Sequence, residues 1–176
     1  MLRRCSLCLW LVVVGLVGCS QHPPGPTRPE KVTIAAGEIG SRLPDFSARD
    51  LQGHPVSSAD LRGKVVLVDF WATWCQPCRK EMPGYQKLLD QYGSRGFVVI
   101  GFKSEVMRDM EDPVQFARTI GVHYPLVVAT DDVTQKFGGI QGLPTTMLYD
   151  RQGILRTKVI GFEYADNFES ALKPLL

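Results

Sequence analysis

After the first forty residues, apolar and polar positions alternate between patterns typical of strands and patterns typical of helices. A near-continuous apolar run at 64–71 predicts a central strand that is buried on both faces. Apolar residues at helical spacing over 76–92 predict an amphipathic helix, and Pro83 inside it is expected to kink it. Further strands are expected at 97–102 and 126–129. The alternation of the two patterns predicts an α/β sheet with parallel crossovers.

The shorter segments complete this picture. A β-hairpin is expected at 45–57, with its turn at 50–53. Asp112 and Pro113 suit the N-cap and first positions of a helix that runs to about residue 120. The remaining expected elements are a short helix at 132–137, an antiparallel hairpin formed by 145–150 and 154–160, and a terminal helix at 163–174.

Residues 1–18 differ in character from the rest of the chain. Arg3 and Arg4 precede an apolar stretch of about a dozen residues, which is too short to cross a bilayer and is typical of a signal peptide. Residues 16–19 read Leu-Val-Gly-Cys, which resembles the lipobox of bacterial lipoproteins, where the cysteine is lipidated and becomes the first residue. Lipidation of Cys19 is therefore expected. The alternative is an ordinary signal peptide with an incidental cysteine.

Residues 19–40 form the second segment. Four prolines between residues 21 and 29 predict a semi-rigid tether rather than part of a folded core. Residues 41–176 then make one domain of sufficient length for a core. Loss of Arg3 and Arg4 with the signal peptide leaves 18 basic and 18 acidic residues, from 20 and 18. A neutral domain without a basic run lacks the electrostatic footprint of a nucleic-acid-binding protein.

The strongest functional signal is Cys75-Gln-Pro-Cys78, placed between the central strand and the helix that follows it. Two thiols three residues apart in a first helical turn share one face and can form a disulfide. The helix N-terminus favours the thiolate of Cys75, and Pro77 has no intrahelical N–H bond to lose there. A CxxC in a βαβ context indicates a redox-active dithiol.

Two other interpretations of this motif are disfavoured. A structural zinc site needs four ligands, and the three histidines (His22, His54 and His123) show no ligand spacing. A purely structural disulfide across so short a loop would constrain the unfolded chain very little. A second CxxC, formed by Cys5 and Cys8, lies inside the expected signal peptide. We expect no metal and no cofactor.

The chain resembles the thioredoxin superfamily, and within it the TlpA/ResA-type extracytoplasmic thiol–disulfide oxidoreductases. The resemblance covers roughly residues 41–175. Its motifs are VVLVDFWATWCQPCRKEMP at 65–83, FVVIG at 97–101, GLPTTMLYD at 142–150 and Gly161. The segments LPDFS (43–47), LQG (51–53) and LRGK (61–64) are more similar to the TlpA/ResA and peroxiredoxin branches than to plain thioredoxin. The resemblance implies a thioredoxin-like α/β fold, with an N-terminal β-hairpin and a central mixed sheet flanked by helices.

The resemblance also implies roles for two acidic residues. Asp69 stands in an otherwise apolar strand, where an unpaired charge is costly. In the family, an aspartate in this position lies beneath the second cysteine and serves proton transfer, although many TlpA/ResA-type sequences have asparagine there. ResA-like proteins have a glutamate at the position of Glu81, where it affects thiol acidity. The alternatives are a solvated strand end for Asp69 and a surface partner of Arg79 or Lys80 for Glu81.

A third set of residues is expected to form the surface that meets the substrate. The family has a cis proline at the position of Pro144, next to the CxxC, and cis bonds are almost confined to X–Pro. Leu143 would then offer its backbone N–H and C=O to a substrate strand. Trp74 is expected to cover the disulfide, with Gln76 and Pro77 also in the contact surface, whereas Trp71 is expected in the core.

Together these features predict thiol–disulfide exchange, with Cys75 attacking and Cys78 resolving. The resemblance implies a monomeric, lipid-anchored reductase of extracytoplasmic disulfide-containing proteins, such as apocytochrome c, re-reduced by a membrane thiol transporter of the DsbD/CcdA type. The anchor would lie in the cell membrane or the outer membrane. A thiol peroxidase of the AhpC/TSA type ranks second, because its required threonine stands three residues before the cysteine, and here Thr73 stands two before. An SCO-like copper chaperone ranks third, because it needs CxxxC and a distal histidine.

Overall fold

The computed structural model describes residues 36–176. The expected signal peptide (1–18), Cys19 and most of the expected tether (19–40) lie outside the described residues. The expected folded domain lies within one compact unit, Thr33–Leu176. No helix in the described part of the chain combines the length and the apolar character that crossing a membrane requires.

The core of this unit is a five-stranded mixed sheet with the strand order β5-β4-β3-β6-β7. β3 pairs in parallel with β4, and β4 with β5, whereas β6 is antiparallel to both β3 and β7. A separate antiparallel hairpin precedes the sheet. The strands are β1 (Ser47–Arg49), β2 (Pro55–Ser57), β3 (Val65–Trp71), β4 (Phe97–Ser104), β5 (Leu126–Ala129), β6 (Thr145–Tyr149) and β7 (Leu155–Ile160). The architecture expected from the sequence is confirmed.

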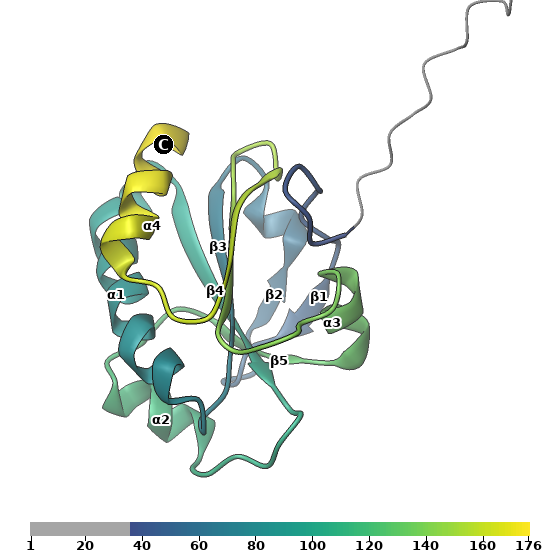
Figure 1. The fold of residues 1–176 in the computed structure, drawn as a ribbon, viewed down its shortest axis with the longest axis vertical. Helices are drawn as coiled ribbons and strands as arrows, with labels where there is room; N and C mark the ends of the chain where they lie inside the picture. Colours follow the sequence, from purple (N-terminus) through teal and green to yellow (C-terminus); the bar gives the residue numbers. More distant parts are fainter. Residues whose placement is uncertain (1–35) are drawn as a thin grey trace, which may run out of the picture. The chain divides into compact units, whose positions relative to one another are not determined.

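Four α-helices cover the two faces of the sheet (Figure 1). They are α1 (Gln76–Tyr92), α2 (Pro113–Thr119), α3 (Asp131–Lys136) and α4 (Ala165–Leu172). α1, α2 and α4 lie on one face, and α3 lies on the other together with the β1–β2 hairpin. Asp112 caps α2 as predicted, because its carboxylate accepts a hydrogen bond from the N–H of Gln115 at 2.8 Å.

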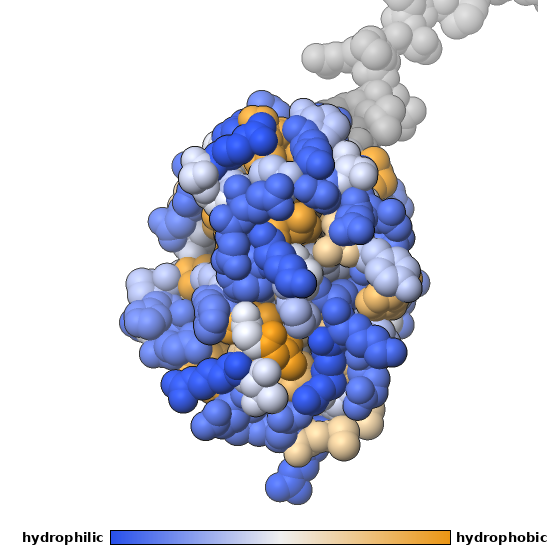
Figure 2. All heavy atoms as spheres, turned by 90° about the vertical axis from the view of Figure 1, so that its left-hand side faces the viewer, coloured by the Kyte–Doolittle hydropathy of each residue, from blue (hydrophilic) through white to orange (hydrophobic). Residues whose placement is uncertain are grey.

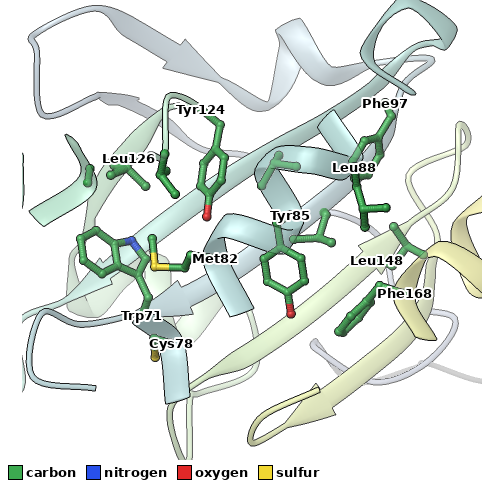
Figure 3. Close-up of a cluster of buried hydrophobic side chains, with 14 of the residues drawn as sticks. Trp71, Cys78, Met82, Tyr85, Leu88, Phe97, Tyr124, Leu126, Leu148 and Phe168 are labelled. Atoms are coloured by element: carbon green, nitrogen blue, oxygen red, sulfur yellow. The ribbon is translucent and has the colours of Figure 1, made fainter. Parts of the chain in front are cut away.

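All seven residues of β3 are buried, as its continuous apolar run predicts. Because side chains alternate along a strand, Val65, Leu67 and Trp71 pack in the α1 layer, and Val66, Val68 and Phe70 pack in the α3 layer. Figure 3 shows the α1 layer, in which Cys78 lies at the same end of the cluster as Trp71. Alternation therefore places Asp69 on the α1 side of the sheet.

The differences from the expected elements are small. β4 continues to Ser104, two residues beyond the predicted end, and α3 begins at Asp131 behind an N-cap from Thr130. The terminal helix is shorter than expected and is followed by a 3₁₀ turn, Lys173–Leu175. On the face shown in Figure 2, hydrophilic residues cover most of the surface and hydrophobic ones appear in small groups.

Gly101 in β4 marks the tightest packing beside the central strand. A Cβ atom there would lie 2.6 Å from Cδ2 of Leu126 and 2.9 Å from Nε1 of Trp71. Trp71 cannot easily yield, because its indole stacks on the Phe116 ring of α2 with 5.1 Å between the centroids. The absence of a side chain at position 101 therefore makes room for the indole.

We expect Gly101→Ala to lower the free energy of unfolding by about 1–3 kcal/mol, because the added methyl overpacks a buried contact. Gly93→Ala is the matched control, since Gly93 has a helical φ of −57° and its Cβ would meet only Cδ1 of Leu89 at 3.5 Å. Urea unfolding of both variants measures the difference. Equal effects of the two substitutions would contradict the packing assigned to Gly101.

Candidate redox site

The two cysteines of the CxxC motif lie at the start of α1, at the carboxyl end of β3. Cys75 is the N-cap residue of the helix and Cys78 lies within its first turn. They form a disulfide, with 5.3 Å between their Cα atoms. The N–H of Cys78 donates a hydrogen bond to Sγ of Cys75 at 3.3 Å. The predicted dithiol therefore occupies a helix N-terminus, where unpaired N–H groups favour negative charge on sulfur.

Exposure distinguishes the two sulfur-bearing residues. Cys75 keeps 3% of its surface exposed and Cys78 keeps none. Between them, Gln76 and Pro77 are exposed, and a proline occupies the first turn as expected. A partner can therefore approach through Cys75 and the exposed dipeptide, while Cys78 lies behind them.

Asp69 is completely buried in the middle of β3, next to Gly101 of β4 and Thr146 of β6. Neither carboxylate oxygen has a hydrogen-bond partner within residues 36–176. Burial raises the pKa of Asp69 from 3.8 to about 8, because the surroundings disfavour the charged form. The alternative of a solvated strand-end residue is therefore wrong.

Glu81 is also buried, on the face of α1 that packs against the sheet. One oxygen accepts a hydrogen bond from the N–H of Glu163 at 3.3 Å, and the other has no partner in the described chain. Burial, followed by the nearby charge of Asp69, raises the pKa of Glu81 from 4.5 to about 9. The surface-partner alternative is wrong, because Arg79 pairs with Glu111 instead.

Two tyrosines extend this buried polar cluster, and the sequence reasoning assigned chemistry to neither. The hydroxyl groups of Tyr85 and Thr146 are hydrogen-bonded at 3.1 Å, and the Tyr124 hydroxyl is buried without a partner in residues 36–176. Burial and the charge of Asp69 raise the pKa of both tyrosines, so both stay protonated at neutral pH. Tyr85 follows Glu81 by four residues, a helical spacing that could have indicated their common face.

The Leu143–Pro144 peptide bond is cis, which confirms the prediction. The carbonyl of Pro144 accepts a hydrogen bond from the N–H of Gly161 at 2.8 Å, whereas the N–H and C=O of Leu143 bond to no other group of residues 36–176. Leu143 and Trp74 both line an open cleft of about 520 Å³. The structure therefore brings Trp74 beside the residue that was expected to receive the substrate backbone. Trp71 lies in the core, as predicted.

The described residues offer no donor set for a metal. Within residues 36–176, no three His, Cys, Asp or Glu side chains are grouped so that they could hold an ion.

The family can now be assigned from comparison with known proteins. The model of the AhpC/TSA family matches residues 39–158. The chain belongs to the AhpC/TSA family. Within this thioredoxin-like family, the chain is similar to thiol-disulfide oxidoreductase ResA of Geobacillus kaustophilus, with 33% identity over 147 residues, which are 83% of this chain and 81% of the relative. ResA of Bacillus thuringiensis is 31% identical over 169 residues, covering 94% and 91% of the two chains.

Solved structures agree with this assignment. A thiol:disulfide interchange protein of the thioredoxin family from Chlorobium tepidum aligns with a TM-score of 0.71 and 32% identity, over 80% of this chain and 99% of the other. A thiol:disulfide interchange protein from a Bacteroides species aligns with a TM-score of 0.65 and 28% identity, over 78% and 90%. This AhpC/TSA family member is therefore a thiol–disulfide oxidoreductase with a thioredoxin-like fold and a Cys75–Cys78 pair.

Proposed function

We propose that the protein is a lipid-anchored disulfide reductase that acts on proteins outside the cytoplasm, including apocytochrome c whose haem-binding cysteines have become oxidised. The observation that carries the reductase proposal is the position of the Cys75–Cys78 disulfide at a helix N-terminus, with the buried Glu81 one turn after Cys78 and the buried Asp69 close enough to Glu81 to raise its pKa. The extracytoplasmic site and the anchor at Cys19, in the cell membrane or the outer membrane, are supported by the pattern of residues 1–19.

The reaction starts from the reduced protein. The Cys75 thiolate attacks one sulfur of a substrate disulfide, which breaks that bond and leaves a mixed disulfide and a substrate thiolate. Cys78 then loses its proton and attacks Sγ of Cys75, which releases the second substrate sulfur as a thiol. Two electrons have passed from the dithiol to the substrate. A membrane dithiol donor of the DsbD/CcdA type would return the oxidised protein to its starting state.

The buried acids would serve the second step. Asp69 would accept the proton of Cys78, and its raised pKa suits an exchange with a thiol near neutral pH. Glu81 would adjust the acidity of the pair, because a charge on either carboxyl disfavours a charge on the other. Leu143 would pair its free N–H and C=O with the backbone of the substrate, next to Trp74 in the cleft.

A peroxidase function is less well supported, although the chain belongs to the AhpC/TSA family. The only hydroxyl near the nucleophile in the sequence, that of Thr73, donates a hydrogen bond to Asp109 at 3.0 Å. It is therefore engaged by a neighbouring loop and does not act on Cys75. The copper-chaperone alternative is also less well supported, because CxxC replaces the CxxxC it needs and, within residues 36–176, His123 is exposed and its backbone N–H donates to the side chain of Gln86.

The function is tested by trapping. We expect Cys78→Ala to accumulate mixed disulfides between Cys75 and its substrates, because the resolving thiol is missing. Cys75→Ala is the matched control and should trap nothing. Mass spectrometry of non-reduced complexes identifies the partners, and mild alkylation of the reduced protein should label Cys75 before Cys78. Preferential trapping by the Cys75→Ala variant would reverse the two roles.

The anchor is tested separately with the full chain. Cys19→Ser should abolish labelling by radioactive palmitate and release the protein from the membrane fraction. Disulfide reduction by the released protein should stay within about twofold of the parent, because the reactive pair lies far along the chain in the compact unit. Unchanged labelling and fractionation would disprove lipidation at Cys19.

Asp69→Asn should change stability and rate in opposite directions. Between about pH 4 and pH 8 the folded protein holds a proton on Asp69 that the unfolded chain has released, so this carboxyl weakens folding as pH rises through that interval. The substitution should therefore raise the free energy of unfolding at pH 7 by about 1–3 kcal/mol. The same change removes the proton acceptor and should slow resolution by Cys78 by about ten- to a hundredfold.

Urea unfolding at pH 5 and pH 8, together with stopped-flow exchange kinetics, measures both effects. Asp132→Asn is the control, since the Asp132 carboxylate is 71% exposed and pairs with Lys136 on the surface. An exchange rate that Asp69→Asn leaves unchanged would contradict the proton-transfer role. A lower free energy of unfolding for Asp69→Asn at neutral pH would contradict the burial of the Asp69 carboxyl without a partner.

A further inference from the structure

The loop of residues 105–112, between β4 and α2, exposes large apolar side chains while two of its acidic side chains are half-buried. Its three large apolar side chains point to solvent, with exposed fractions of 87% for Val106, 57% for Met107 and 76% for Met110. In Figure 1 this 105–112 loop runs along the bottom of the view, leading into α2. Exposure of methionine and valine side chains to water is unfavourable, and a group of exposed apolar side chains commonly marks an interaction site.

Two half-buried acidic side chains of the same loop, Asp109 and Glu111, contact the body of the domain and hold the loop in place, whereas Glu105, Arg108 and Asp112 are exposed. Asp109 accepts a hydrogen bond from the Thr73 hydroxyl at 3.0 Å and pairs with the Lys103 ammonium at 2.7 Å. Lys103 is only 4% exposed and Asp109 is 27% exposed, so this ion pair is partly shielded from water. The N–H of Met110 donates back to the Thr73 hydroxyl at 3.1 Å, and Glu111 pairs with Arg79.

These attachments place the loop beside the redox pair. Thr73 stands two residues before Cys75, and Arg79 directly follows Cys78, so the loop is fastened on both sides of the CxxC motif. Val106 also lines the cleft that contains Trp74 and Leu143. Val106 is therefore continuous with the surface at which a substrate disulfide is exchanged, and Met107 and Met110 follow it in the same exposed loop.

We propose that the 105–112 loop is a docking surface for an apolar segment of the oxidised polypeptide substrate, held in position by Asp109. This inference rests on the proposed reductase function and names the class of substrate that the site prefers: polypeptides with large apolar residues next to the reactive cysteine. Met107 and Met110 suit varied apolar partners, because the unbranched thioether side chain adapts its shape.

Charge favours a polypeptide over a membrane surface as the occupant. The loop carries four acidic residues (Glu105, Asp109, Glu111 and Asp112) and a single arginine. Anionic lipid headgroups would repel this excess of negative charge, whereas an apolar peptide segment is not repelled. A lipid surface also could not use the continuity between the loop and the disulfide.

The test compares the full reduced chain with the double variant Met107→Ser/Met110→Ser. The substrates are two glutathionylated peptides that differ only in the residues flanking cysteine, Leu and Phe in one and Ser and Gly in the other. In each reaction the dithiol becomes a disulfide, and peptide thiol and glutathione are released. The variant should reduce the apolar peptide about tenfold more slowly, and the polar peptide and oxidised glutathione within about twofold of the parent rate.

Ile39→Ser is the matched control, because Ile39 is 57% exposed but adjoins Gly40, which is bonded to Leu155 at the far end of β7 from the cis proline. It should leave all three rates unchanged. Asp109→Asn should weaken the same preference with every apolar side chain still present, since it removes the ion pair with Lys103 that helps to position the loop.

The outcomes separate the two proposals. Failure of the parent protein to reduce oxidised glutathione or either peptide would refute the reductase function itself. Reduction of both peptides at equal rates by the parent, or an equal loss on both in the double variant, would overturn the docking surface alone. A change from dimer to monomer in sedimentation, with unchanged peptide rates, would make the loop an interface between two copies and would also overturn it.

Discussion

The burial of β3 on both faces is the constraint on which the rest of the site depends. A strand without a solvent-facing side has to place every side chain in the core, and this includes the carboxyl of Asp69. Burying an ionised carboxylate without a partner is costly, so the group keeps its proton to a higher pH and its pKa rises to about 8, which leaves a minor ionised fraction at neutral pH. Burial of apolar side chains in the layers on both faces offsets the free-energy cost of burying this carboxyl.

The same strand delivers the chemistry. β3 ends where α1 begins, so the cysteines sit at a helix N-terminus while the acid carried by the strand lies inside, on the α1 side. The helix N-terminus favours a thiolate at Cys75, whereas burial disfavours a carboxylate at Asp69, a few residues earlier in the chain. Proton exchange between a thiol and a carboxyl is easiest when their pKa values approach each other, and the raised pKa of Asp69 moves this carboxyl towards the range of a thiol.

Much of this could be predicted from the sequence, because its signals were local. The double burial of 65–71, the helix behind Cys75 and the Asp112 cap follow from short patterns, and the cis proline at 144 was implied by the family resemblance. Contacts between distant residues could not be predicted in this way. The Thr73–Asp109 bond joins residues 36 positions apart, and the Glu81 bond to the N–H of Glu163 spans 82. Periodic hydrophobic patterns carry no information about such pairs, so the hydrogen-bond partner of Glu81 could not be predicted from the sequence.

The 105–112 loop shows how such distant contacts can matter for function. From sequence alone, an apolar side chain in a loop is ordinarily expected to be buried. In the structure, the contacts of Asp109 and Glu111 with the body of the domain orient the loop so that its large apolar side chains are exposed. These contacts have a second effect, since they join Thr73 and Arg79, on either side of the reactive pair, to the same loop. A loop anchored to the residues that flank the nucleophile can present a bound segment in a fixed orientation to Cys75. Recognition and reaction would then share the same short stretch of chain.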